Sequence, residues 1–296
     1  MRSVLYEIRG VFSLLYLVVN TVFWVSLLYT VTLLRLTLPF SIGRKLCGKV
    51  AIWIAESWIC FNNAGLVLTR KIEFDLTGLE QLDRRAWYLV ISNHQCGVDI
   101  PVLQKVLYHR IPFLKFFIKK ELIWVPLLGL AWWALDFPFM KRYSNDFLRK
   151  HPHLKGKDLD ITRKACEKFR DNPVSIMNFI EGTRFAEAKR DAQNSPYRHL
   201  LRPKAGGIGF VLSAMGDQLS FILDITIFYP AGAPGFWSFL CGRVKRVEVH
   251  VEKHPITPTL LGDYSRDEQY RIRFQNWLND LWAEKDERLR QANSQL

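Results

Sequence analysis

The sequence has few cysteines and lacks the motifs with which most basic proteins bind nucleic acids. Its cysteines (Cys47, Cys60, Cys96, Cys166 and Cys241) are odd in number and never form a C-x-x-C pair. This spacing argues against a disulfide framework and a structural zinc site, and favours a reducing compartment. Lys and Arg total 41 against 28 acidic residues, a net charge of +13, yet no RGG tract, RNP-like motif or zinc-finger pattern occurs. We therefore expect the anionic partner to be a membrane surface and not a nucleic acid.

Charged residues are also missing from a long run near the N-terminus. Residues 10–34 carry no charge, and as a helix they are long enough to cross roughly 30 Å of hydrocarbon. No small-residue cleavage site follows, so we expect this helix to remain on the mature protein. Arg35, Arg44, Lys45 and Lys49 lie just beyond it and, by the positive-inside rule, favour the cytoplasm for the downstream side.

A second apolar stretch, residues 50–68, differs because it contains Glu56, Asn62 and Asn63. These polar side chains are typical of an interfacial or re-entrant helix and not of a clean span. Two arrangements of the N-terminus therefore stay open: one membrane-spanning helix, or a helical hairpin that dips into one leaflet.

Short apolar runs separated by helical stretches follow from about residue 67, a pattern that predicts an α/β domain. We expect a mixed or parallel sheet flanked by helices, preceded by the membrane helix or hairpin. The expected divisions are 1–65 for the membrane-embedded helices, 66–262 for the α/β domain and 263–296 for a C-terminal amphipathic helix. The predicted strands are 87–92, 174–180, 221–229 and 244–252, and residues 159–170 are expected to form a helix.

The C-terminal segment carries helix signals of its own. Ser265 followed by Glu268 predicts a capping box. We expect this helix to pack on the α/β domain, with a membrane-lying helix as the alternative. The apolar residues that recur at helical spacing are Phe274, Trp277, Leu278, Leu281, Trp282 and Leu289.

An N-H-x4-D pattern directly follows the first predicted strand of the α/β domain, and ligands gather at the carboxyl ends of strands in such sheets. On one continuous helix, Asp99 would lie about 140° from His94, so the two side chains could not share a face. Pro101 suits the first turn of a helix, which leaves His94 on the preceding loop and lets the chain return Asp99 to the imidazole. Such a pair suits base catalysis on an alcohol.

The other histidines carry no such context. His153 and Asp158 repeat the H-x4-D spacing in a polar stretch with no strand before it, and we expect that copy to be a loop. No metal site is expected, because no ligand spacing relates the remaining histidines, which are His109, His151, His199, His250 and His254.

A second polar block, Glu181-Gly182-Thr183-Arg184, ends another predicted strand. Glycine lets the backbone approach a ligand closely, threonine adds a donor, and arginine offers a bidentate contact for phosphate. A given tetrapeptide of this kind occurs by chance in such a chain only on the order of a few times in a thousand. The block therefore makes the case for a site far more specific than the histidine pattern alone.

Further cations accompany this block in the sequence. Lys204 stands beside a pair of glycines, and Lys141 and Arg142 close an apolar run. Two or three cations converging near one catalytic histidine predict an acceptor that carries a phosphate. For Lys141 and Arg142, a solvated or headgroup-contacting role is the alternative.

These blocks, in this order and spacing, resemble the PlsC-type 1-acylglycerol-3-phosphate acyltransferase (lysophosphatidate acyltransferase) family over residues 87–232. The N-H-x4-D run matches the family's first block, FMKR its second, EGTR its third, and the strand ending in FYP its fourth. The flanking sequence, including WYLVISNH and WLNDLWAEKDERL, is similar to the bacterial YihG-like branch over almost the whole chain.

The resemblance implies a membrane-bound enzyme that moves a fatty acyl group from acyl-CoA or acyl carrier protein to the 2-hydroxyl of 1-acyl-glycerol-3-phosphate, giving phosphatidate. It implies His94 as general base, Asp99 as its orienting partner, no bound cofactor or metal, and a bacterial inner membrane with the active site facing the cytoplasm. The residues implied for the phosphate are Glu181, Gly182, Thr183, Arg184, Lys204, Lys141 and Arg142, and those implied for support or acyl contact are Asn93, Gly97, Tyr229 and Pro230.

Because the alcohol would attack the thioester directly, a tetrahedral oxyanion forms, and we expect backbone amides of residues 93–97 to stabilise it.

Two residues depart from the family's pattern. Ile180 replaces the usual proline before EGTR, a change that we expect to be tolerated. Cys96 takes a small-residue place and suggests a rival hypothesis, in which it is the nucleophile and His94 its base. An acyl-cysteine is unnecessary, however, when the thioester donor is already activated.

Other functions remain as alternatives. The acceptor could be another lysophospholipid such as lysophosphatidylglycerol, or the chain could be a non-enzymatic basic membrane-binding protein. A thioester hydrolase would use the same base on water, but water needs no phosphate site. Residues 124–139, rich in Trp and Leu, are expected to be core, with the wall of an acyl-chain tunnel as the alternative.

Overall fold

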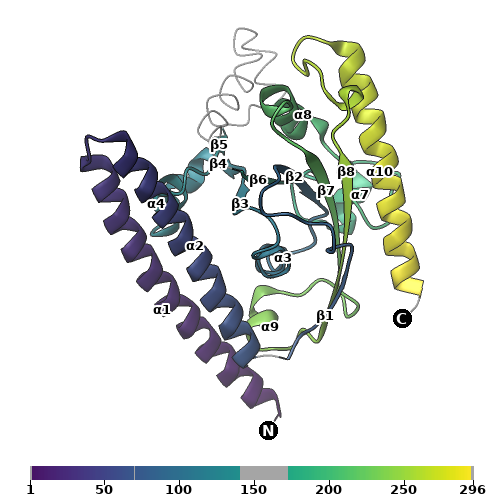
Figure 1. Cartoon of the computed structure of the whole chain (residues 1–296). Helices are drawn as coiled ribbons and strands as arrows, with labels where there is room; N and C mark the ends of the chain where they lie inside the picture. The colour runs from purple at the N-terminus through teal and green to yellow at the C-terminus, as the bar shows by residue number, and fades with distance from the viewer. Residues whose placement is uncertain (1, 70, 141–172, 295–296) are drawn as a thin grey trace.

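The computed structural model describes residues 2–69, 71–140 and 173–294. The chain begins with two long helices, α1 (Arg2–Thr37) and α2 (Ser41–Thr69), which form a hairpin along one side of an α/β domain (Figure 1). Within the described residues, α1 alone is long and apolar enough to cross a membrane, from Ser3 to Thr37. The apolar stretch over 50–68 forms the second half of α2.

Six strands of the described chain form the central sheet, in the order β1-β8-β7-β2-β6-β3. Neighbouring strands run parallel except for β7 and β8, so the sheet is mixed, as predicted. The four predicted strands are confirmed as β2, β6, β7 and β8, with ends that differ by at most three residues. The strands are β1 (Glu73–Thr77), β2 (Tyr88–Ser92), β3 (Leu114–Phe116), β6 (Ser175–Phe179), β7 (Phe221–Phe228) and β8 (Arg246–Pro255), and a separate parallel pair is β4 (Ile118–Lys119) with β5 (Phe139–Met140).

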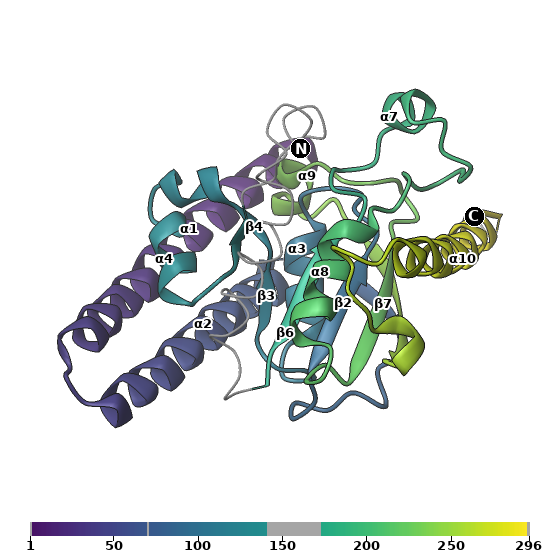
Figure 2. The same cartoon turned by 90° about the horizontal axis from the view of Figure 1, so that it is seen from above.

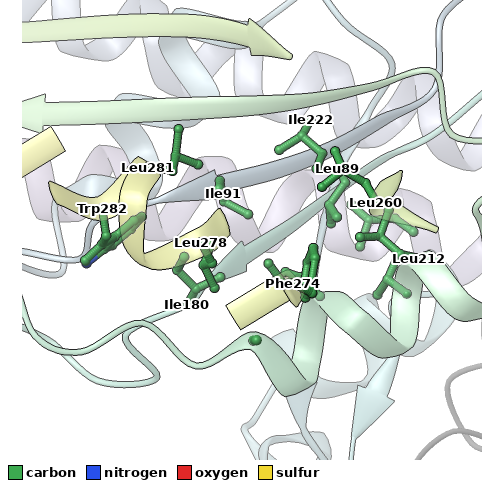
Figure 3. Packing of buried hydrophobic residues seen from close by; sticks show 14 of the residues in the cluster. Leu89, Ile91, Ile180, Leu212, Ile222, Leu260, Phe274, Leu278, Leu281 and Trp282 are labelled. Atoms are coloured by element: carbon green, nitrogen blue, oxygen red, sulfur yellow. The ribbon is translucent and has the colours of Figure 1, made fainter. Parts of the chain in front are cut away.

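Helices cover both faces of the sheet (Figure 2). Alternate residues of β2 divide between two cores: Tyr88 and Val90 pack with α3, whereas Leu89 and Ile91 pack with α8 and α10 (Figure 3). A strand buried on both faces is typical of a parallel sheet. The helices are α3 (Asp99–Leu107), η1 (Lys120–Trp124), α4 (Leu128–Ala134), α7 (Glu187–Ala192), α8 (Ala205–Met215), α9 (Phe236–Leu240), η3 (Pro258–Leu260) and α10 (Glu268–Ser294).

The C-terminal helix packs on the domain as predicted, because the side chains of Phe274, Leu278 and Trp282 are buried against the sheet. The prediction that Ser265 and Glu268 form a capping box for this helix is wrong. α10 begins at Glu268, and the Oδ1 of Asp267 accepts a hydrogen bond from the Tyr270 amide at 2.9 Å. Aspartate therefore caps this helix, two residues later than Ser265 would.

Three predictions fall outside the described residues. These are the helix expected over 159–170, the second H-x4-D spacing at His153, and the site cations Lys141 and Arg142.

Candidate active site

The parallel register brings three chain segments to one edge of the sheet. Ser92, the last residue of β2, pairs with Phe179 of β6 and with Ile225 of β7. The residues that follow β2 and β6 therefore lie side by side where the sheet ends. This edge holds the residues of the first and third sequence blocks.

Asn93 fixes the start of the loop between β2 and α3 against β7. Its Nδ2 donates to the carbonyl of Ile227 at 2.9 Å, and its Oδ1 accepts from the Ile227 amide at 2.8 Å. The amide side chain thus replaces one rung of the sheet ladder and has no exposed surface. Its role in the structure is support, not contact with a ligand.

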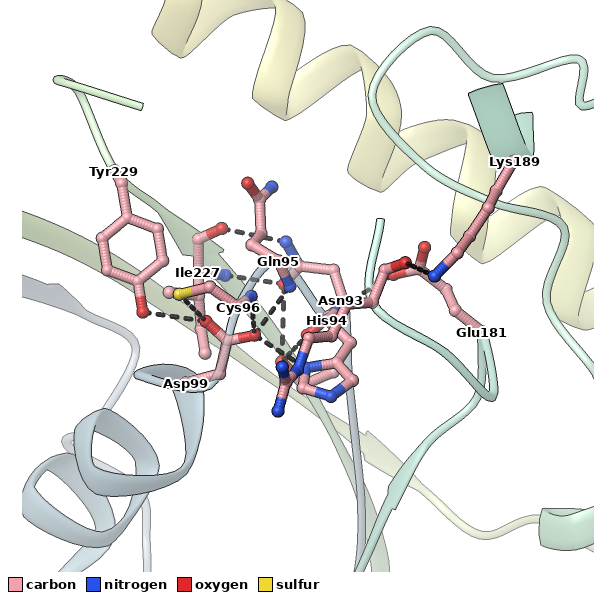
Figure 4. Close-up of polar contacts among 11 residues, drawn as sticks. Asn93, His94, Gln95, Cys96, Asp99, Glu181, Lys189, Ile227 and Tyr229 are labelled. Carbon is pink, nitrogen blue, oxygen red and sulfur yellow. Dashed lines mark hydrogen bonds and ion pairs between the residues drawn. The ribbon is translucent and has the colours of Figure 1, made fainter. Parts of the chain in front are cut away.

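His94 and Asp99 meet as the sequence predicted. The Nδ1 of His94 lies 2.8 Å from Oδ2 of Asp99, which begins α3 and is completely buried (Figure 4). The same oxygen accepts from the amides of Gln95 at 2.6 Å and Cys96 at 2.9 Å. Several donors therefore hold the carboxylate that orients the imidazole, and the ring keeps Nε2 for a substrate.

Tyr229, which follows β7, holds the other carboxylate oxygen. Its hydroxyl donates to Oδ1 of Asp99 at 2.8 Å. Burial, with the charge of Asp99 beside it, raises the pKa of Tyr229, so the phenol keeps its proton. Pro230 comes next in the chain and is half-buried.

Phe179 is a site residue that the sequence analysis missed. Its ring stacks on the imidazole of His94 with 3.9 Å between ring centroids and 14° between the planes. The imidazole is therefore held at its edge by Asp99 and on one face by an aromatic ring. An aromatic residue two positions before Glu181, at the end of a predicted strand, was the signal available in the sequence.

Glu181 does not lie where a phosphate could reach it. Its carboxylate is completely buried; Oε1 accepts from the His94 amide at 2.8 Å and Oε2 from the Leu201 amide at 2.9 Å. The structure therefore assigns Glu181 to holding two loops together, in place of the phosphate contact that the family resemblance implied. Burial raises the pKa of this carboxyl to about 7.

The backbone amides expected to stabilise an oxyanion are largely occupied. The amide of His94 donates to Glu181, and those of Gln95 and Cys96 donate to Asp99. The expectation therefore fails for these three amides, because they already donate to the carboxylates of Glu181 and Asp99.

The remaining residues of the EGTR block surround the loop. Gly182 has φ +73°, a left-handed conformation that favours glycine. The exposed Arg184 lies over Gly97, because a Cβ at that glycine would come within 3.5 Å of the guanidinium. Thr183 accepts a hydrogen bond from Lys189 at 2.8 Å, a cation of α7 that the sequence analysis did not single out.

Of the other predicted cations, Lys204 is exposed at the start of α8, and its amide donates to the carbonyl of Ile180 at 2.8 Å. Lys141 and Arg142 lie outside the described residues.

Cys96 lies within hydrogen-bonding distance of the dyad but is poorly suited to attack. Its Sγ is 3.4 Å from Oδ1 of Asp99. Burial and the adjacent carboxylate raise the pKa of the thiol to about 12, whereas a nucleophilic cysteine needs its thiolate.

An apolar cavity of about 470 Å³ adjoins His94, between the hairpin and the α/β domain. This volume lies in the range of small-molecule sites. Residues 124–139 were predicted to be core, and this holds for Ala131 and Ala134, which are buried in a cluster with residues of the helical hairpin. Other residues of the same stretch form a wall of the cavity. Residues lining it include Tyr16, Trp58, Leu128, Trp132, Phe137 and Phe179.

The buried Glu181 carboxyl predicts a pH dependence of stability. Its folded-state pKa of about 7 lies above 4.5, so the neutral form favours the fold, and this contribution is present below about pH 4.5 and lost as pH rises to about 7. The free energy of unfolding of wild type relative to Glu181→Gln should fall by about 3 kcal/mol across that window. Denaturant titrations in detergent measure it. Glu187→Gln, an exposed change on α7, is the control, and parallel curves for wild type and Glu181→Gln would contradict the prediction.

A histidine oriented by a buried carboxylate lies at the end of a parallel strand and beside an apolar cavity, an arrangement that is chemically suited to base catalysis on a substrate with an apolar part. The sequence matches the family described as Acyltransferase over residues 73–230, more than half of its length. The chain belongs to this acyltransferase family.

Named relatives within the family are distant in sequence. The chain is 25% identical over 295 residues to "Lysocardiolipin acyltransferase 1" of Danio rerio, covering 95% of this chain and 70% of that protein. It is 24% identical over 249 residues to "1-acyl-sn-glycerol-3-phosphate acyltransferase gamma" of Mus musculus, covering 79% and 59%. The chain spans about half to seven tenths of the length of the curated relatives it matches.

A solved structure shares the fold along almost the whole chain. The "1-acyl-sn-glycerophosphate (LPA) acyltransferase, PlsC, from Thermotoga maritima" superposes with a TM-score of 0.56 at 18% identity, covering 98% of each chain. The expected fold, a mixed sheet flanked by helices and preceded by long N-terminal helices, is thereby confirmed.

Proposed function

We propose that this protein transfers a fatty acyl group from a thioester to the free 2-hydroxyl of 1-acyl-glycerol-3-phosphate, giving phosphatidate. The observation that carries the proposal is the His94–Asp99 pair beside the apolar cavity, with Arg184 over the same loop. Nε2 of His94 takes the hydroxyl proton as the oxygen attacks the thioester carbonyl. The tetrahedral intermediate then expels the thiolate, which receives that proton from the imidazolium. Atoms balance without a covalent enzyme intermediate or a bound cofactor.

The headgroup would lie on the exposed, cationic side of the loop. Arg184 and Lys204 are both exposed there, and Lys189 adds a third cation beside Thr183. A guanidinium can bind two phosphate oxygens at once. The acyl chain, in contrast, needs an apolar environment, which the cavity on the other side of His94 supplies. The donor is acyl-CoA or acyl carrier protein, both of which are anionic partners suited to a chain of net charge +13.

The contacts at the two ends of α1 favour a helical hairpin in one leaflet and argue against a membrane-spanning α1. Near its N-terminus, Glu7 pairs with Arg243 and accepts from Trp237; near its C-terminus, Arg35 pairs with Asp136 at 3.0 Å. Glu7 and Arg35 lie about 40 Å apart along the helix, more than the roughly 30 Å of hydrocarbon. Because charged residues of one domain hold both ends, a spanning α1 would draw that domain into the bilayer.

The outward face of α1 is apolar, which supports membrane contact. We propose that the protein lies on the bacterial inner membrane with its active site facing the cytoplasm, which is what the sequence resemblance to the YihG-like branch implies. Exposed apolar residues of α1 include Leu5, Phe12, Leu15, Val19, Phe23 and Leu33.

A different acceptor is the second candidate. Relatives named lysocardiolipin acyltransferase favour a phosphate-bearing lysolipid with a larger headgroup, and lysophosphatidylglycerol belongs to the same chemical class. All of these acceptors present a phosphate and a free glycerol hydroxyl, so the same dyad would serve each of them.

The test supplies purified protein in detergent with oleoyl-CoA and one of four acceptor conditions: lysophosphatidate, lysophosphatidylglycerol, lysocardiolipin or none. We expect thiol release and a new phospholipid, fastest with lysophosphatidate. Faster turnover with another acceptor would select the second candidate. Thiol release without acceptor would indicate a hydrolase, and vesicle binding with no turnover, even with acyl carrier protein as donor, a non-enzymatic membrane protein.

Direct attack by the alcohol predicts that Cys96 is dispensable. Cys96→Ser should keep most of the acyl-transfer rate, because serine can still donate to Oδ1 of Asp99 and the thiol itself does not react. Initial rates of phosphatidate formation measure this. A loss as large as that of His94→Ala, in a variant that remains folded, would restore the acyl-cysteine hypothesis.

A further inference from the structure

The segment formed by η1 and α4 exposes an unusual number of large apolar side chains. We call residues 122–133 the Trp124 segment; no charged residue occurs between Glu121 and Asp136. Trp124 is 85% exposed, the highest value among the exposed large apolar residues of the described chain. The other exposed apolar side chains of the segment are Leu122, Leu127, Leu130 and Trp133.

The segment is apolar on its inner side as well. Ala131 packs in the core below the hairpin, and Leu128 and Trp132 line the cavity that adjoins His94. A helix that is apolar all round is normally buried, because a surface helix keeps its outer face polar. The outer face of the Trp124 segment is therefore suited to cover by another apolar phase.

The backbone conformation of the segment holds these exposed side chains outward. A Cβ at Gly129 would lie 2.0 Å from the carbonyl oxygen of Ile123, so only glycine fits this close turn. Leu127 has φ +62°, which is rare for a leucine, and its carbonyl accepts a hydrogen bond from the hydroxyl of Tyr29 on α1. The exposed side chains are thus held outward by a defined turn that is anchored to the hairpin.

The neighbouring surface indicates what covers the segment. α4 lies beside α1 in both overall views (Figures 1 and 2), and both helices carry exposed large apolar side chains. Two exposed lysines, Lys119 and Lys120, lie just before the segment, where they can contact anionic headgroups. Tryptophan is enriched where protein crosses the headgroup region. The position of α4 beside α1 and these lysines favour a lipid leaflet over a protein partner.

We propose that the Trp124 segment is a second lipid-contacting element, inserted in the leaflet that α1 contacts, and that it forms the rim over which a membrane-borne acceptor passes into the cavity beside His94. This inference rests on the proposed function, because it assumes an acceptor that resides in the membrane. It assigns the segment a task separate from attachment: α1 holds the protein on the leaflet, whereas the Trp124 segment opens the site to it.

The test compares Trp124→Ser with wild type under two presentations of the acceptor. One is long-chain lysophosphatidate in vesicles of phosphatidylcholine and phosphatidylglycerol; the other is a short-chain, monomeric lysophosphatidate in solution. We expect roughly a tenfold lower rate on vesicles and an unchanged rate on the monomeric acceptor. Ile272→Ser, which removes a 57% exposed apolar side chain from α10, is the matched control and should change neither rate.

Two results would overturn the inference. An unchanged vesicle rate would show that Trp124 has no part in lipid access, and equal losses on both acceptors would show a structural role. A second measurement is independent of turnover: brominated phosphatidylcholine quenches tryptophans that enter the leaflet. Quenching should be weaker in Trp124→Phe than in wild type, and equal quenching would point to a protein partner on this surface. An inactive wild type with Trp124-dependent quenching would refute the proposed reaction and leave the lipid contact in place.

Discussion

His94→Ala is expected to lower the rate of acyl transfer on the order of 10³- to 10⁴-fold, because it removes the only proton acceptor that the described site presents to the acceptor hydroxyl. The imidazole is held by the 2.8 Å contact of Nδ1 with Asp99 and by the stacked ring of Phe179, so its position is fixed before substrate arrives. Preorganisation of this kind makes the loss large, since no nearby group can take over the role. Initial rates of phosphatidate formation from oleoyl-CoA and lysophosphatidate measure it.

The control for His94→Ala is His109→Ala, which removes a half-exposed histidine from the loop after α3. That variant should keep the wild-type rate. Vesicle binding should be unchanged in both variants, because neither alters α1 or the Trp124 segment. A fall of less than about tenfold in a folded His94→Ala protein would exclude His94 as the base.

The sequence predicted the strands with long apolar or alternating runs and missed those that are short or contain charged residues. β2, β6, β7 and β8 are continuous or alternating apolar runs, and such runs can be recognised as strands from the sequence alone. β1 lies at the sheet edge with charged residues in it, and β3 has three residues with a buried lysine in the middle. Neither pattern differs from loop sequence. The strand order also depends on pairings between distant segments, which local periodicity does not encode.

The candidate site shows a similar division. The meeting of His94 with Asp99 could be predicted because the two are only five positions apart in sequence, and Pro101 marks the helix start that follows the His94 loop. The role of Glu181 could not be predicted, because its partners include an amide 87 positions away in sequence. The same holds for the stack of Phe179 on His94, since sequence places the two residues at the ends of different strands but gives no register between them.

Asp99→Asn is expected to lower the rate on the order of 10²- to 10³-fold while leaving the fold intact. Every described partner of this carboxylate is a donor: Oδ2 accepts from His94 and from the amides of Gln95 and Cys96, and Oδ1 accepts from Tyr229 and the Cys96 thiol. The side-chain oxygen of asparagine can keep the contacts with the two backbone amides. Its side-chain NH₂ would then face Tyr229, whose hydroxyl can rotate to accept a hydrogen bond. What asparagine cannot supply is the negative charge that stabilises the imidazolium formed during proton transfer. The loss should therefore appear in kcat more than in KM.

Tyr229→Phe separates that charge from the hydrogen bonds around it. Phenylalanine removes one donor from Oδ1 of Asp99 and leaves the carboxylate and its contact with His94 in place, so the rate should fall by less than about tenfold. If the two variants lost activity equally, the network would act by geometry alone. A much larger loss for Asp99→Asn would mean that this buried charge, held by donors from the loop and from Tyr229 after β7, is what makes the histidine a base.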